Sequence, residues 1–85
     1  MTLKEILEEL VKGIVQTEEV AVVNEKIEVM HGKETLHFTI QVKPEEFSLL
    51  VGKGGSTIKA LRVVMSKLAG KKKKRVFVDL DEGEK

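Results

Sequence analysis

Cysteine, tyrosine and tryptophan are missing from the sequence, and proline occurs once, at Pro44. Without cysteine the chain forms neither disulfides nor cysteine-ligated metal sites, which fits a reducing compartment. The N-terminus lacks the basic-then-apolar pattern of a signal peptide, because Glu5, Glu8 and Glu9 interrupt it. No apolar run approaches the roughly 20 residues needed to cross a bilayer. We therefore expect a soluble, cytoplasmic protein with no membrane partner.

Groups typical of catalytic and cofactor sites are also scarce. The only histidines are His31 and His37, and neither stands in a metal-ligand spacing with acidic residues. The glycine-rich stretch around Lys53 is not a nucleotide-binding P-loop, because Gly54 follows the lysine where Ser or Thr is required. It is not a dinucleotide fingerprint either, because Thr57 stands where the third glycine is needed. We expect no enzyme activity, no cofactor and no metal site.

Charge is distributed unevenly along a chain whose net charge is only +1. Residues 1–51 carry five Lys and ten Glu, whereas residues 52–75 carry seven Lys, two Arg and no acidic residue. A positive segment within a nearly neutral protein indicates an anionic partner. A solvated lysine-rich surface, common in proteins from hot environments, would give a similar composition. The coincidence of the positive segment with a glycine-rich loop favours the anionic partner.

Apolar periodicity predicts six elements in a chain long enough for one domain, residues 1–85. Thr2 and Glu5 form a capping box at the start of the first helix. Apolar residues alternate with polar ones from residue 35 to 42, as in a strand with one buried face. The predicted elements are a helix at 3–15, strands at 20–30 and 35–42, helices at 44–51 and 56–69, and a strand at 76–80, before a frayed acidic tail at 81–85.

Four local features carry more specific expectations. Apolar residues of both parities open the strand at 20–30, so either its start is buried on both faces or a bulge lies near Asn24. Val64 falls on the apolar stripe of the helix that begins near residue 56. Gly70 is expected to end that helix in the left-handed conformation. Phe77 has the opposite parity to its apolar neighbours, so it faces either a second buried surface or a partner.

Two predicted helices are separated by Gly52-Lys53-Gly54-Gly55. Glycine adopts backbone angles that a Cβ would forbid, so a ligand backbone can lie directly against this loop. The N-terminus of the following helix adds unpaired N–H groups and a positive dipole end, which suit a phosphate. Lys53 supplies a full charge, and Ser56 and Thr57 can cap the helix or donate a hydroxyl. A plain connector between two helices is the alternative interpretation of these glycines.

The run LVGKGGSTIKALR, from Leu50 to Arg62, resembles the core signature of KH domains. The predicted order α-β-β-α-α-β matches the type II arrangement, and the short chain resembles the stand-alone bacterial KhpA/YlqC proteins over roughly residues 3–80. The resemblance implies an α+β fold, a single type II KH domain whose three-stranded sheet is covered on one face by three helices. Gly54 and Ser56 depart from the family pattern, which often has bulkier polar or basic residues there, so this loop is less charged than usual.

The resemblance also implies a mode of binding, in which the loop clamps the backbone of about four unpaired nucleotides of single-stranded RNA. The bases would enter a groove walled by the strand at 76–80, with Val51, Ile58 or neighbouring apolar groups as its floor. Lys59 and Arg62 would reach flanking phosphates, and the run from Lys71 to Arg75 would extend the electrostatic footprint, although both could be solvated surface. The candidate RNA-binding residues are Gly52, Lys53, Gly54, Gly55, Ser56, Thr57, Lys59, Arg62, Lys71, Lys72, Lys73, Lys74 and Arg75.

The resemblance implies an RNA chaperone or post-transcriptional regulator, as a homodimer or paired with a larger KH-containing protein. The alternative is a dimerisation or protein-interaction module with weak or no RNA binding. Because nothing in the sequence reports contacts to a 2′-hydroxyl, single-stranded DNA stays open as a ligand.

Overall fold

The computed structural model describes residues 1–15 and 22–82, and within them the order of elements is the predicted α-β-β-α-α-β. A single 3₁₀ turn, η1, joins the second and third helices. Within the described part of the chain, no helix combines the length and apolar character required of a membrane span. The elements are α1 (Leu3–Ile14), β1 (Val22–Met30), β2 (Lys33–Val42), α2 (Pro44–Val51), η1 (Lys53–Gly55), α3 (Ser56–Lys71) and β3 (Arg75–Glu82).

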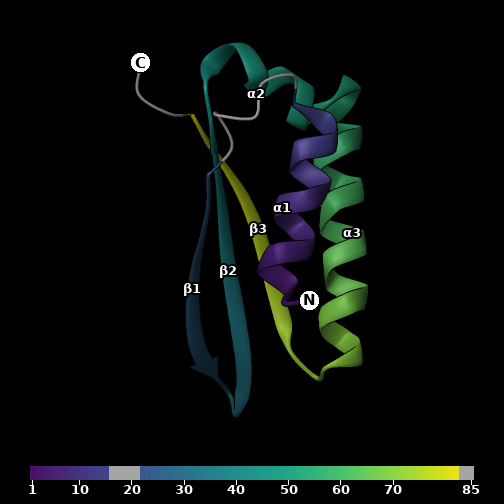
Figure 1. Ribbon diagram of the computed structural model, residues 1–85. Coiled ribbons are helices and arrows are strands. Elements are labelled where there is room, and N and C mark those ends of the chain that lie inside the picture. The colour runs from purple at the N-terminus through teal and green to yellow at the C-terminus, as the bar shows by residue number, and fades with distance from the viewer. Residues whose placement is uncertain (16–21, 83–85) are drawn as a thin grey trace.

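The three strands form one sheet in the order β1-β2-β3 (Figure 1). The antiparallel pair β1 and β2 forms a hairpin, closed by His31 and Gly32. Both turn residues have positive φ, 52° and 76°, the type I′ geometry that matches the twist of a hairpin. Strands β2 and β3 are parallel, because the chain crosses over through α2 and α3 before it returns.

The pairing of β1 with β2 is unbroken from Val22 to Met30, so the bulge considered near Asn24 is absent. The alternative, two-sided burial at the start of the strand, rests largely on residues before Val22, which lie outside the described residues. Leu36, Phe38, Ile40 and Val42 are buried as predicted. Thr35 is also buried, although it belongs to the face expected to be polar.

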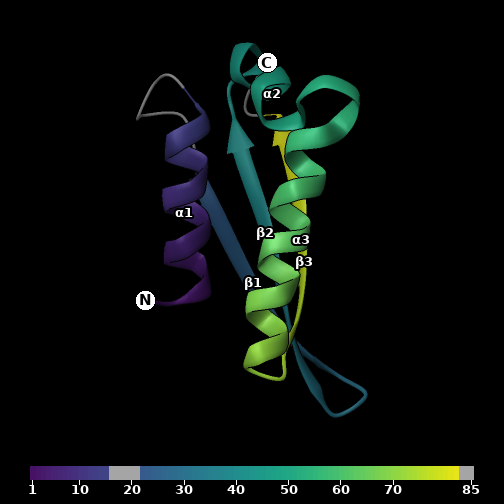
Figure 2. The ribbon, with the colours of Figure 1, turned by 90° about the vertical axis from the view of Figure 1, so that its right-hand side faces the viewer.

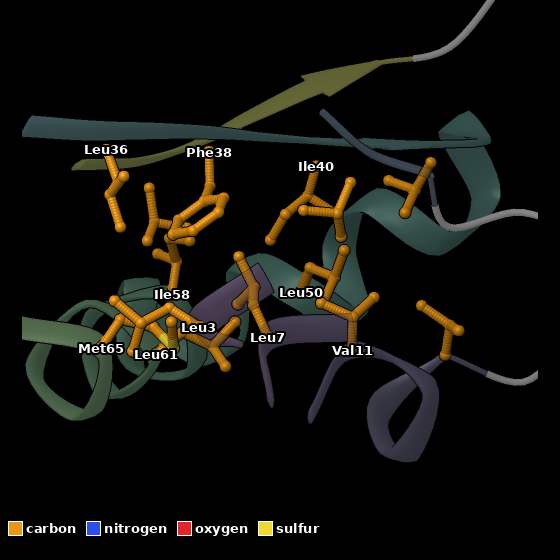
Figure 3. Close-up of a cluster of buried hydrophobic side chains, with 14 of the residues drawn as sticks. Leu3, Leu7, Val11, Leu36, Phe38, Ile40, Leu50, Ile58, Leu61 and Met65 are labelled. Carbon is orange, nitrogen blue, oxygen red and sulfur yellow. The ribbon is translucent and has the colours of Figure 1, made fainter. Parts of the chain in front are cut away.

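All three helices cover one face of the sheet, and the core lies between the two layers (Figure 2). Figure 3 shows side chains of β2 pointing toward those of α1, α2 and α3, with Phe38 meeting the helical layer. Phe38, Leu7 and Met65 are completely buried. One apolar core therefore holds the helices on the sheet. It fixes the positions of α2 and α3, which the loop connects.

Helix α1 begins with the predicted capping box. The Glu5 N–H donates to Thr2 Oγ1 at 3.1 Å, and the Thr2 N–H donates to Glu5 Oε1 at 2.9 Å. These bonds favour the ionised carboxylate and lower the pKa of Glu5, the backbone bond from Thr2 most. The buried residues of this helix are Leu3, Leu7 and Val11, one turn apart on a single face.

Helix α3 differs from its prediction at two positions. Val64 is exposed, because the buried stripe runs through Ile58, Leu61, Met65 and Ala69 instead. The prediction for Gly70 is also wrong, since it lies within the helix and the left-handed residue is Lys73, at φ 58°. The N–H groups of Lys72 and Lys74 both donate to the Ala69 carbonyl at 2.9 Å, which ends the helix beyond the glycine.

The last strand is longer than predicted. Asp81 and Glu82 pair with Gln41 and Val42 in β2, so the frayed tail does not begin at residue 81. Residues 83–85 lie outside the described residues. Phe77 lies on the face of the sheet that the helices leave open, where its half-exposed ring stacks on His37 with centroids 5.2 Å apart. This ring contact replaces the second buried surface that was one of the two expectations.

Candidate nucleic-acid interface

The loop between α2 and α3 contains three glycines with positive φ. Gly52 ends α2 at φ 75° and ψ 171°, while Gly54 and Gly55 have φ of 63° and 79°. The region that Gly52 occupies is essentially restricted to glycine. A Cβ on Gly52 would overlap the Thr57 hydroxyl and lie 2.7 Å from the Thr57 backbone nitrogen, whereas one on Gly54 would meet no atom of the described residues within 4 Å. Gly52 is therefore required for the close approach of the loop to Thr57. Gly54 leaves the outer surface of the loop without a side chain.

The N-terminus of α3 faces this loop without a side-chain cap. Its N-cap is Gly55, and no hydroxyl bonds the first turn, so the capping considered for Ser56 and Thr57 does not occur. No acidic residue lies in the first turn, and the Lys53 side chain is exposed beside it. Unpaired N–H groups at a helix N-terminus attract anions because they combine donors with the positive end of the helix dipole. The loop can accept a phosphate.

A groove lies between α3 and the edge of β3, from Arg62 toward the C-terminal end of α3. One hollow of about 330 Å³ is lined by residues of both elements: Arg62, Ser66, Val76, Phe77, Val78 and Asp79. A second hollow of about 300 Å³ shares Ser66, Val76 and Phe77 with the first and ends at Lys74 and Arg75. The strand wall is where it was predicted. Of the groups expected at the floor, neither Val51 nor Ile58 lines these hollows, and Ile58 is buried in the core, which leaves neighbouring apolar groups.

Arg62 crosses this groove instead of reaching outward along the helix. Its Nε donates to the Val78 carbonyl oxygen at 2.9 Å, and its Nη2 lies 3.7 Å from Asp79 Oδ1. The guanidinium therefore ties α3 to the edge of β3 and presents its remaining N–H groups in the groove. Ser66 lines the same groove one turn further along α3, and sequence reasoning missed it. Its spacing of four residues from Arg62 was the available signal.

The basic residues do not form one patch. Lys59 lies beside the loop, since its Cε is 3.8 Å from the position of a Cβ on Gly55. The run from Lys71 to Arg75 is at the other end of the 16-residue helix α3, about 24 Å away at 1.5 Å per residue. Lys74 Nζ lies 3.4 Å from Glu34 Oε1, which partly neutralises it. Only Lys74 and Arg75 of this run line the groove.

Comparison with known proteins identifies the family of this chain. The sequence model of the KhpA/KhpB KH domain matches residues 4–80. The RNA-binding protein KhpA of Clostridium perfringens is 33% identical over 78 residues, covering 92% of this chain and 99% of that protein. The RNA-binding protein KhpA of Thermotoga maritima is 39% identical over 71 residues, covering 84% of this chain and 89% of that protein.

Two solved structures share the fold at low sequence identity. The structure of Era with MgGDPNP and nucleotides 1506–1542 of 16S ribosomal RNA has a TM-score of 0.61 at 20% identity, and Aquifex aeolicus Era bound to GDP and AlF4⁻ has a TM-score of 0.60 at 20% identity. Each comparison covers 94% of this chain but 29% of the Era chain, so the likeness concerns one part of those larger proteins. The match over most of its length and the similarity to curated relatives show that this chain belongs to the KhpA/KhpB family of KH domains.

Proposed function

We propose that the chain binds single-stranded RNA, with the loop Gly52–Gly55 holding the sugar–phosphate backbone and the groove along α3 and β3 receiving the bases. The observation that carries the proposal is the bare glycine loop at the uncapped N-terminus of α3, the helix that lines the groove from Arg62 onward. Family relatives named as RNA-binding proteins support the choice of ligand.

The clamp works through the protein backbone. A phosphate placed against Gly54 meets no Cβ, so it can approach the first N–H groups of α3. Lys53 at the tip adds a charge-assisted contact, and Ser56 and Thr57 can donate hydroxyls because neither is used as a cap. Lys59, beside the loop, can meet the next phosphate along the chain.

Bases are selected for being unpaired. The groove is bounded by a helix on one side and a strand edge on the other, so it admits single bases and excludes a stacked pair. Arg62 and Ser66 offer donors there, while Val76 and Val78 supply apolar contact. The basic run Lys71–Arg75, a helix length away, attracts RNA by long-range electrostatics and extends the footprint past the clamp.

The biological role that fits such a small module is that of an RNA chaperone or post-transcriptional regulator. One groove gives modest affinity, so pairing with a second KH chain, as a homodimer or with a larger KH-containing protein, would raise avidity. A protein-interaction role is the second candidate, favoured by exposed apolar residues on β1. The two roles use different surfaces and are compatible.

The test is a titration of a short single-stranded RNA and of its duplex at two salt concentrations, with the double variant K53D/G54D as control. We expect the single strand to bind more tightly than the duplex, with a steep loss of affinity in high salt. The double variant should lose binding and stay folded, because it places carboxylates where the phosphate lies, and Asp tolerates left-handed φ better than most residues. Unchanged RNA affinity in the folded variant would remove the loop from the mechanism.

A further inference from the structure

Phe77 presents an aromatic ring that the fold does not bury. Its side chain is 50% exposed and lies on the sheet face that points away from the three helices (Figure 1). One side of the ring stacks on His37 of β2, with the ring centroids 5.2 Å apart and an angle of 19° between the ring planes. The other two phenylalanines, Phe38 and Phe47, belong to the core or pack against it. Phe77 is therefore the aromatic ring that a ligand can reach.

The second side of the Phe77 ring points over the edge of the sheet. Neighbouring strands lie about 4.8 Å apart, and the 5.2 Å separation of the two ring centroids is close to that spacing. The rings of His37 and Phe77 therefore stand side by side across β2 and β3, each with one face toward the other. Strand β3 is at the end of the order β1-β2-β3, so no strand of the described residues lies on the far side of Phe77. That side is open to a planar group.

The open side of the ring adjoins the groove between α3 and β3. Both hollows of the groove, of about 330 and 300 Å³, are lined by Ser66, Val76 and Phe77. Consecutive side chains of a strand point to opposite faces of the sheet, so a hollow lined by both Val76 and Phe77 lies at the edge of β3. Ser66 is about 15 Å along α3 from Ser56, at 1.5 Å per residue. Phe77 thus lies at the part of the groove that is distant from the glycine loop.

Charge on the open face of the sheet determines on which side of Phe77 a nucleic-acid backbone can lie. Arg75 precedes Phe77 by two residues in β3, so its exposed side chain shares the same face. Asp79 and Asp81 follow Phe77 on that face, and Asp79 Oδ1 is 3.7 Å from Arg62 Nη2. A phosphate is attracted by the arginine and repelled by the two carboxylates. The backbone of a strand that leaves the groove therefore passes on the Arg75 side.

We propose that Phe77 forms a base-stacking subsite, in which an unpaired nucleobase of the bound strand stacks on the outer side of the ring and Arg75 contacts an adjacent phosphate. The base continues the stack that begins with His37 and Phe77. The inference rests on the proposed RNA binding and extends it beyond the glycine loop. Because every base has a π-face, the subsite requires a base but accepts any of the four. The paired bases of a duplex are already stacked on one another and cannot enter it.

The experiment combines substitutions at Phe77 with removal of single bases from the RNA. The probe is a short single-stranded RNA of mixed sequence, together with a series in which one nucleotide at a time is abasic. For the wild-type chain, one abasic position should raise the dissociation constant by about 5- to 150-fold through loss of the stack. F77A should weaken binding of the intact RNA by a similar factor. It should also be insensitive to the abasic nucleotide at that position, because both changes remove the same contact.

Two matched variants separate stacking from apolar bulk. F77L keeps an apolar side chain without a ring and should bind like F77A. V64A truncates an apolar side chain that is also exposed but lies outside both hollows, and it should bind like the wild-type chain. Circular dichroism of each variant checks that the domain is folded.

F77W gives a direct signal from the subsite, because the chain contains no other Trp and no Tyr. The indole ring can stack on a base as the phenyl ring does, so RNA affinity should be kept. Saturating RNA should quench its fluorescence, and the RNA that is abasic at the stacking position should leave it bright.

Unchanged RNA affinity in folded F77A would overturn the proposal, and so would F77W fluorescence that RNA does not alter. Failure of the subsite is distinguishable from failure of the proposed function. If the subsite alone is wrong, K53D/G54D loses RNA binding while F77A retains it. If the wild-type chain binds no single-stranded RNA, the proposed function and the subsite are both wrong.

Discussion

Replacing glycine by alanine at two positions of the loop tests the geometry on which the binding proposal depends. Gly52 lies in a backbone region that costs alanine about 1–3 kcal/mol. Its new Cβ would also lie 2.7 Å from the Thr57 backbone nitrogen, which can move only if α3 moves. Gly54 is in the left-handed region with open space around it, so Gly54→Ala should cost only about 1 kcal/mol. We expect Gly52→Ala to cost at least about 3 kcal/mol.

The assay is urea unfolding of the two variants in parallel, supported by thermal melts. For a domain of this size, 1 kcal/mol corresponds to roughly 4–8 °C, so Gly54→Ala should lower the melting temperature by that amount and Gly52→Ala by at least about 12 °C. RNA affinity should fall more than stability does in Gly54→Ala. The protein stays folded, but the new methyl group lies between the loop and the phosphate. Equal destabilisation by the two substitutions would refute the loop conformation.

Three further predictions concern the ends of the helices. Gly70→Ala should stabilise the protein by about 0.5–1 kcal/mol in urea unfolding, because the residue is helical with no atom of the described residues near the new Cβ; destabilisation would restore a left-handed cap there. Replacing Lys71–Lys73 with Ser should weaken binding to all single-stranded sequences alike and reduce the salt slope by about 0.7 for each phosphate that is no longer neutralised; a sequence-selective effect would show that these lysines read bases. Thr2→Ala should lower thermal stability at neutral pH. Because the folded pKa of Glu5 is lowered, the contribution of its carboxylate is present above the unfolded pKa and is lost as the pH falls through the folded value, so the effect of Thr2→Ala should shrink in acid; an effect that is constant with pH would contradict the capping box.

Local sequence determined the elements and the position of the candidate site. The capping box of Thr2 and Glu5, the alternation through Phe38 and the stop at Gly52 each depend on residues within one or two turns, so short-range sterics and hydrogen bonding fix them wherever the segment lies. The basic segment 52–75, which has no acidic residue, could also be identified from the sequence. Local sequence patterns thus predicted the order of elements and the loop at which two helices meet.

The tertiary structure decided which surfaces are covered and what each long side chain contacts. Val64 is exposed because the side of α3 that packs into the core carries the stripe through Met65, and periodicity alone admits both stripes. Arg62 reaches the Val78 carbonyl because β3 returns beside α3, a contact between residues 16 apart in sequence. Ile27 is 54% exposed although it pairs with buried Leu36, because it lines an open hollow of about 420 Å³ beside the first turn of α1, and no local pattern contains that spacing between elements.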